Sequence, residues 1–224
     1  PGVMAGNAWL LKHASGVTGS ALLIEELFRE AGFPADLLRA VILRGGPPVL
    51  ELIDDPRVAA VTLTGSGPAG RAVAERAGRN LKKCVLELGG SDPYLVLEDA
   101  NLTLAARACA RGRMINAGQS CIAAKRLIVV EPVRSRFEEM LVREMAAYRP
   151  GDPLGPDTEL GPLADRAGRE RLHEQVRRSV EQGARVILGG RLPEGPGAFY
   201  PPTVLAGVRP GMPAFDEELF GPVA

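Results

Sequence analysis

The chain has 224 residues, of which 46% are hydrophobic and 24% are charged, so a disordered or collagen-like chain is excluded. Its 27 basic and 27 acidic side chains cancel, and we expect no nucleic-acid partner because such binders carry a basic excess. No apolar run approaches membrane-spanning length, so no membrane partner is expected. Three cysteines cannot all pair and match no metal motif, which favours a reducing, cytoplasmic location and no bound metal.

Short apolar runs alternate with amphipathic stretches along the chain. This alternation is typical of βαβ units, so we predict an α/β fold with a Rossmann-like parallel sheet. In chain order, the expected elements are strand 8–12, helix 20–31, strand 38–43, helix 49–53, strand 58–64, a helix ending at 77, strand 83–88, strand 94–97, helix 101–116, strand 126–130, helix 135–148, helix 167–182, strand 184–188 and strand 203–208.

A double glycine at 89–90 directly follows a predicted strand and interrupts the pattern. We therefore expect one domain over residues 1–90 and a second over residues 91–224. The chain opens on Pro1 and ends on Ala224 without a terminating helix, so we also expect it to be a piece of a longer protein.

A glycine turn follows the strand at 58–64, with Gly65 and Ser66 at the turn and Gly70 one helical turn later. Such a strand-to-helix turn exposes backbone N–H groups at the positive end of a helix, where a pyrophosphate can bind. The acidic residue expected about 20 residues after a dinucleotide-binding glycine motif is absent from its usual place. A tight turn in which Ser66 only caps the helix therefore stays open as the alternative.

Cys121 lies in a loop of small residues, where a ligand can approach the backbone and a thiolate can act as a nucleophile. The other two cysteines look structural, because Cys84 sits in an alternating strand and Cys109 among helical alanines. From the residues alone, Cys121 is either catalytic or a third small core residue.

Glu87 is the one charged residue within the apolar run at 84–88. It is either a structural cap or a general base in a partly buried site. Lys12 ends the first predicted strand and is either solvated or a contact for a phosphate or ribose. His13 and His173 lie in no nucleophile motif, so a Cys–His hydrolase has no support.

Seven blocks of this sequence, taken together and in order, resemble the aldehyde dehydrogenase family, and the wording of two of them is most similar to its succinate-semialdehyde branch. The separation of 34 residues between Glu87 and Cys121 also matches the family. The blocks are GNAWLLKHA (6–14), VTLTGSGPAG (61–70), VLELGGSDP (85–93), NAGQSCIAAKR (116–126), LGP (160–162), YPPTVL (200–205) and EELFGPVA (217–224).

The resemblance implies an NAD(P)-binding portion followed by part of an α/β catalytic domain, and an enzyme that oxidises an aldehyde to the carboxylic acid. It implies that Cys121 attacks the aldehyde to form a thiohemiacetal, that hydride leaves to the nicotinamide, and that Glu87 activates water to hydrolyse the resulting thioester. The backbone N–H of Cys121 would be one oxyanion donor.

The resemblance also implies a set of residues that contact NAD or NADP through the ribose, pyrophosphate and nicotinamide. Many NAD-preferring relatives carry a glutamate where this chain has Ser15, so we expect NADP to be accepted as well as NAD. The implied coenzyme residues are Lys12, Ser15, Gly65, Ser66, Gly70, Leu88, Glu218 and Phe220.

In the resembling enzymes, a second oxyanion donor is an asparagine that precedes the strand ending at Lys12, and Asn7 is not its equivalent. We therefore expect this chain alone to have little activity, and the intact enzyme to be a homodimer or homotetramer acting on a small aldehyde. Three alternatives stay open: an inactive piece with a structural or interaction role, a dehydrogenase of another substrate class, and a CoA-acylating enzyme. The position of Glu87 argues against the last, because a base there favours water as the acyl acceptor.

Overall fold

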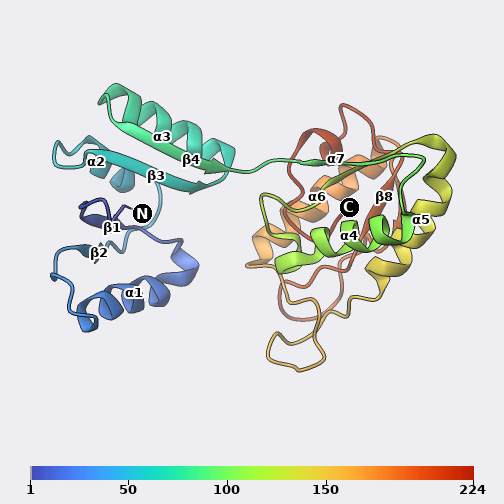
Figure 1. The fold of residues 1–224 in the computed structure, drawn as a ribbon, viewed down its shortest axis with the longest axis horizontal. Helices are drawn as coiled ribbons and strands as arrows, with labels where there is room; N and C mark the ends of the chain where they lie inside the picture. The colour runs from blue at the N-terminus through green and yellow to red at the C-terminus, as the bar shows by residue number, and fades with distance from the viewer. Residues whose placement is uncertain (1) are drawn as a thin grey trace. The chain divides into compact units, whose positions relative to one another are not determined.

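A computed structural model describes residues 2–224, which divide into two compact units, the first ending at Leu88 and the second comprising Gly89–Ala224 (Figure 1). In the first unit the elements are β1 (Trp9–Leu11), η1 (Ser15–Val17), α1 (Thr18–Glu30), β2 (Leu38–Ala40), α2 (Pro47–Asp54), β3 (Ala60–Gly65), α3 (Gly67–Arg79) and β4 (Lys83–Leu88). In the second unit they are β5 (Pro93–Val96), α4 (Leu102–Met114), η2 (Ile115–Gly118), β6 (Arg126–Val129), α5 (Glu131–Ala146), α6 (Arg166–Glu181), β7 (Arg185–Leu188), β8 (Val204–Ala206) and α7 (Pro213–Asp216).

The first unit is built on two pairs of parallel strands, β1 with β2 and β3 with β4. Helix α3 connects β3 to β4 and packs against both strands, with α2 beside it (Figure 1). The helix follows from its sequence, because Pro68 suits a first turn, where its missing N–H costs nothing, and Ser66 accepts a hydrogen bond from the Ala69 N–H at 3.5 Å.

The core of this unit lies on one face of the β3–β4 pair, because side chains alternate between the two faces of a strand. The inward-facing and helical residues that pack together are Leu50, Ile53, Val61, Leu63, Val73, Ala77, Cys84 and Leu86. The other face is open: Val85 is 59% exposed and Glu87 is also exposed.

The second unit pairs β5 with β6 in parallel and β7 with β8 antiparallel. Helices α4 and α5 pack against each other, and Asn101 caps α4 by accepting a hydrogen bond from the Leu104 N–H at 3.1 Å. One large hydrophobic core fills the unit; Phe137, Met145 and Tyr200 are at most 1% exposed.

The predicted α/β class is confirmed, with two differences in detail. Within residues 2–224 the strands form four separate two-stranded sheets instead of one continuous parallel sheet, and the β7–β8 pair is antiparallel. The helix expected over 101–116 ends at Met114, because Asn116 and Ala117 adopt left-handed backbone conformations with φ of 52° and 53°. The division of function at residue 90 stays a prediction.

Candidate active site

The loop that carries Cys121 begins with a left-handed stretch at Asn116, Ala117 and Gly118. Left-handed backbone is costly for residues with a Cβ and persists where the surrounding structure enforces it, often at functional sites. Here the Gln119 side chain helps to hold this conformation: its amide donates to the Asn116 carbonyl at 3.1 Å and accepts from the Ala164 N–H at 2.9 Å. The sequence therefore builds a fixed turn directly before the cysteine.

Gly118 is also the point where this loop meets the C-terminal segment of the chain. A Cβ at Gly118 would lie 2.1 Å from the carbonyl oxygen of Gly221, far inside van der Waals contact. Only glycine permits both the φ of 74° and this approach of two backbones. The cysteine loop thus packs against the segment that holds Glu218 and Phe220.

The three cysteines differ in their access to solvent. Cys121 is exposed, Cys84 is half-buried, and Cys109 is buried in the core, where desolvation raises the pKa of its thiol. The Cys121 N–H donates no hydrogen bond within residues 2–224, so it is available to an oxygen bound beside the thiol.

Two buried cations lie beneath the cysteine loop. The Lys125 ammonium donates to the carbonyl oxygens of Ser120 at 3.0 Å and Cys121 at 2.6 Å, and the fully buried Arg113 guanidinium donates to the Gly118 carbonyl. Burial lowers the pKa of Arg113 to about 10 and also lowers the pKa of Lys125, with the charge of Glu218 opposing the shift in both. Sequence inspection missed both residues, because each contacts backbone oxygens, and no pattern predicts those contacts.

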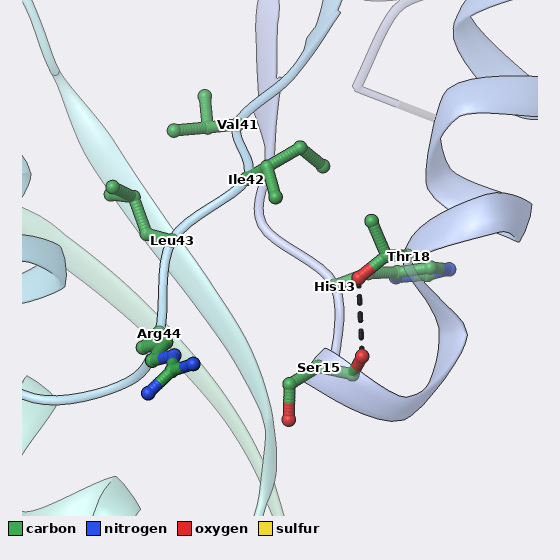
Figure 2. Close-up of a pocket in the computed structure, with 7 residues that line it drawn as sticks. All are labelled: His13, Ser15, Thr18, Val41, Ile42, Leu43 and Arg44. Atoms are coloured by element: carbon green, nitrogen blue, oxygen red, sulfur yellow. Dashed lines mark hydrogen bonds between the residues drawn. The ribbon is translucent and has the colours of Figure 1, made fainter.

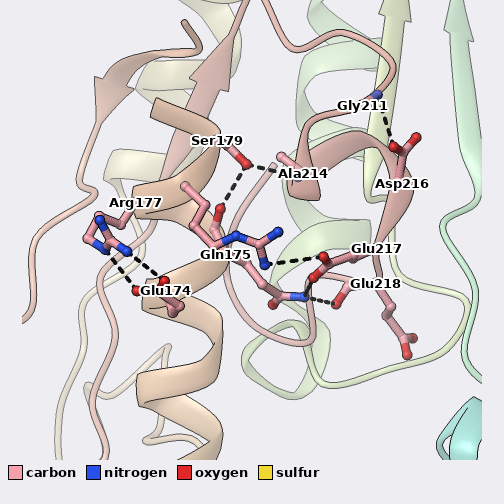
Figure 3. Close-up of polar contacts among 10 residues, drawn as sticks. Glu174, Gln175, Arg177, Ser179, Gly211, Ala214, Asp216, Glu217 and Glu218 are labelled. Carbon is pink, nitrogen blue, oxygen red and sulfur yellow. Dashed lines mark hydrogen bonds and ion pairs between the residues drawn. The ribbon is translucent and has the colours of Figure 1, made fainter. Parts of the chain in front are cut away.

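The C-terminal segment brings Glu218 to the same region. The amide of Gln175 on α6 donates to the Glu218 carbonyl at 3.2 Å and to Glu217 at 2.9 Å, while the Glu218 side chain points away from α6 (Figure 3). Its Oε1 atom lies 3.4 Å from the Lys125 ammonium. Phe220, two residues later, is 47% exposed. The structure therefore brings Glu218 close to the cysteine loop through Lys125, while its contact with the nicotinamide ribose stays a prediction.

In the first unit, the expected pyrophosphate residues surround the start of α3. Gly65 ends β3, Ser66 caps the helix, and a Cβ at Gly70 would lie 2.6 Å from the Leu88 side chain. The capping role that stood as the alternative for Ser66 is present, and it leaves the positive helix terminus beside Gly65 able to receive an anion. Leu88 and Gly70 contact each other and set the distance between helix and strand.

A pocket of about 450 Å³ lies between the loops that follow β1 and β2 (Figure 2). Ser15 and Arg44 both face the space between these loops, and His13 and Thr18 also line it. Arg44 was not predicted, because an arginine after a strand has no distinguishing pattern. Lys12 is half-buried directly after β1 and is not among the residues that line this pocket.

Glu87 lies near the end of β4, opposite Thr64 in the strand register. Glu87 is exposed and makes no hydrogen bond or ion pair within residues 2–224, so the structure shows neither a structural cap nor the partly buried setting expected of a general base. Glu87 belongs to the first unit and Cys121 to the second, and their approach to one another stays a prediction.

Two further properties concern the described part of the chain. Across residues 2–224, no group of three or more histidine, cysteine and acidic side chains is placed to hold a metal ion. None of the helices over these residues is both long enough and apolar enough to cross a membrane.

Comparisons with known proteins agree on one family. The profile described as "Aldehyde dehydrogenase family" matches residues 1–224. The chain is 50% identical to the succinate semialdehyde dehydrogenase [NAD(P)+] Sad of Escherichia coli and 49% identical to a succinate-semialdehyde dehydrogenase [NADP(+)] of Deinococcus radiodurans, in each case over all 224 residues.

Among solved structures, succinic semialdehyde dehydrogenase from Streptococcus pyogenes in complex with NADP+ superposes with a TM-score of 0.94 at 38% identity, over 98% of this chain. That match covers 48% of the Streptococcus chain, and the two curated matches cover 48% and 47% of those proteins. The chain therefore spans about half the length of the relatives it matches. On these grounds it belongs to the aldehyde dehydrogenase family.

Proposed function

We propose that this chain carries the nucleophile, the base and most of the coenzyme contacts of an NAD(P)-dependent dehydrogenase that oxidises succinate semialdehyde to succinate. The observation that carries the proposal is the Cys121 loop: an exposed thiol beside an unoccupied backbone N–H, on a turn held by two buried cations. An exposed nucleophile next to a fixed hydrogen-bond donor is the arrangement that acyl chemistry requires.

The proposed reaction starts when the Cys121 thiolate attacks the aldehyde carbon. The Cys121 N–H then donates to the oxyanion of the resulting thiohemiacetal, and removing one such donor typically costs about a hundredfold to a thousandfold in rate. The chemistry that bound NAD or NADP supplies is acceptance of a hydride, which leaves a thioester on Cys121. Glu87 removes a proton from a water molecule that attacks this thioester, the C–S bond breaks with Cys121 leaving as a thiolate, and the carboxylic acid is released.

The residues of the first unit fit a dinucleotide. A positive helix terminus at Ser66 suits the pyrophosphate, and the contact between Gly70 and Leu88 leaves no room there for a larger side chain. In the pocket between the β1 and β2 loops, Ser15 can donate a hydrogen bond and Arg44 carries a positive charge. This combination suits the 2′-phosphate of NADP, because arginine pairs well with phosphate oxygens.

The substrate assignment rests on the relatives, several of which are named for succinate semialdehyde. The test is NADPH and NADH formation by the full-length protein with succinate semialdehyde, betaine aldehyde and simple aliphatic aldehydes. We expect the highest kcat/KM with succinate semialdehyde and loss of turnover in Cys121→Ala, while Cys84→Ala, a change at a half-buried thiol, keeps it.

A higher kcat/KM with another aldehyde would reject the substrate but keep the reaction class. Turnover that survives in Cys121→Ala would reject the mechanism, and a full-length protein inactive with every aldehyde would favour a structural role. A homo-oligomer and a cytoplasmic location stay predictions.

A further inference from the structure

Lys125 is a buried cation that supports the cysteine loop but takes part in no step of the proposed reaction. Its side chain is 1% exposed, and its ammonium reaches the carbonyl oxygens of Ser120 at 3.0 Å and Cys121 at 2.6 Å. The third oxygen within reach is Oε1 of Glu218, at 3.4 Å. One ammonium therefore contacts both the backbone of the nucleophile and a carboxylate from the distant C-terminal segment.

Burying a charge is expensive unless hydrogen bonds and an opposite charge compensate for it. The Lys125 ammonium donates two hydrogen bonds and forms an ion pair with Glu218, whereas the neighbouring Arg113 keeps two nitrogens, Nε and Nη1, without a hydrogen-bond partner in the described chain. Lys125 is therefore the cation whose geometry ties the loop to Glu218, and Arg113 supports the loop at Gly118 alone.

The two oxygens of Glu218 have different surroundings. Oε1 faces Lys125 and accepts from the Gly90 N–H at 3.3 Å, while Oε2 accepts no hydrogen bond within the described chain. A Cβ at residue 89 would lie 1.9 Å from Oε2, so Gly89 leaves the space that this oxygen occupies. The carboxylate is thus held by one oxygen, and the other lies beside Gly89 without a hydrogen bond in the described chain.

We propose that Lys125 is a positioning residue that holds the backbone of Cys121 and the Glu218 carboxylate in one fixed arrangement, so that Oε2 of Glu218 is presented to the nicotinamide ribose next to the nucleophile. This inference rests on the proposed function, in which Glu218 contacts the coenzyme. A lysine that only filled the core would affect stability alone. A positioning lysine also sets coenzyme affinity and the reactivity of the thiol.

The test compares Lys125→Met, Glu218→Gln and the double variant in the full-length protein, by equilibrium binding of NADPH and by the rate at which iodoacetamide labels Cys121. Lys125→Met weakens NADPH binding about tenfold, which corresponds to about 1.4 kcal/mol. It also slows iodoacetamide labelling of Cys121 severalfold, because the cysteine loop loses the ammonium group that donates to two of its carbonyl oxygens. Glu218→Gln weakens NADPH binding and leaves the labelling rate close to wild type.

The double variant decides whether Lys125 acts on the coenzyme through Glu218. If it does, the double variant binds NADPH as weakly as Glu218→Gln and no more weakly, because the residue being positioned is already gone. This comparison remains valid if Lys125→Met does not fold, since replacing both charges of a buried pair is often tolerated where replacing one is not.

The matched control is Lys82→Met, because the Lys82 ammonium also donates to two backbone carbonyls, those of Ile53 at 2.5 Å and Asp55 at 2.6 Å. This control lowers stability but leaves NADPH binding and Cys121 labelling as in wild type. Unchanged NADPH binding and Cys121 labelling in Lys125→Met would overturn the proposal. A double variant whose loss of NADPH affinity is the product of the two single losses would also overturn it. Unchanged NADPH binding in Glu218→Gln would instead overturn the coenzyme role of Glu218, and with it the part of the inference that rests on it.

Discussion

Replacing Gly118 by alanine tests whether the cysteine loop depends on its contact with the C-terminal segment. Two separate costs arise at this position. The φ of 74° is left-handed, and the new Cβ would lie 2.1 Å from the Gly221 carbonyl oxygen. Gly207 supplies the control, because its φ is 71° and a Cβ there would meet nothing within 4 Å.

The expected magnitudes follow from these two geometries. A left-handed conformation costs a residue with a Cβ about 1–2 kcal/mol, and this cost applies to both substitutions. Overpacking typically adds about 1–3 kcal/mol, and it applies only at Gly118, where the obstacle is backbone that cannot rotate away. Gly118→Ala should therefore lower the free energy of unfolding by about 2–5 kcal/mol and Gly207→Ala by about 1–2 kcal/mol.

Urea unfolding of the full-length protein, followed by circular dichroism, measures this difference. Iodoacetamide labelling of Cys121 under native conditions measures the functional consequence, because a displaced loop changes the labelling rate in Gly118→Ala and not in Gly207→Ala. Equal destabilisation by the two substitutions, with the same labelling rate, would refute the close packing of the two segments.

Three further predictions concern the proposed chemistry. Iodoacetamide labels Cys121 before Cys109, because burial shields Cys109 and raises the pKa of its thiol; peptide mapping that finds the reverse order would contradict the assignment. Glu87→Gln keeps a rapid burst of NADPH but lowers steady-state turnover about a hundredfold or more, as rapid mixing would show, whereas wild-type turnover would make Glu87 structural. Ser15→Glu lowers kcat/KM for NADP about tenfold or more, since like charges about 4 Å apart repel by about 1 kcal/mol in water and about 4 kcal/mol at a dielectric of 20. Arg44→Ala acts in the same direction, and an unchanged NADP-to-NAD ratio in both variants would refute the phosphate pocket.

Local patterns predicted the elements that local forces determine. The strand at Lys83–Leu88 has the predicted bounds, because its residues alternate between a packed and an open face. The turn at Gly65 was also predicted from its residue types, and the cap at Ser66 was the alternative that the sequence left open. The turn and the cap depend on contacts within a few residues of the chain, and the strand is recognisable because its residues alternate between two faces.

Features that depend on distant contacts were not predictable. The expected helix over 101–116 stops early because Asn116 and Ala117 are left-handed, a conformation that asparagine tolerates but alanine does not favour by itself. The antiparallel pairing of β7 with β8 was missed because periodicity gives no strand direction. Lys125 carried no signal in sequence, because its partners are two carbonyl oxygens and a glutamate from another segment.

The measurement that tests the central claim most directly is mass spectrometry of the full-length Glu87→Gln variant after mixing with succinate semialdehyde and NADP. If Cys121 is the nucleophile and Glu87 activates the hydrolytic water, a succinyl thioester accumulates and maps to the peptide that contains Cys121. An acyl group on another residue, or no adduct while NADPH is still formed at the wild-type rate, would contradict the account.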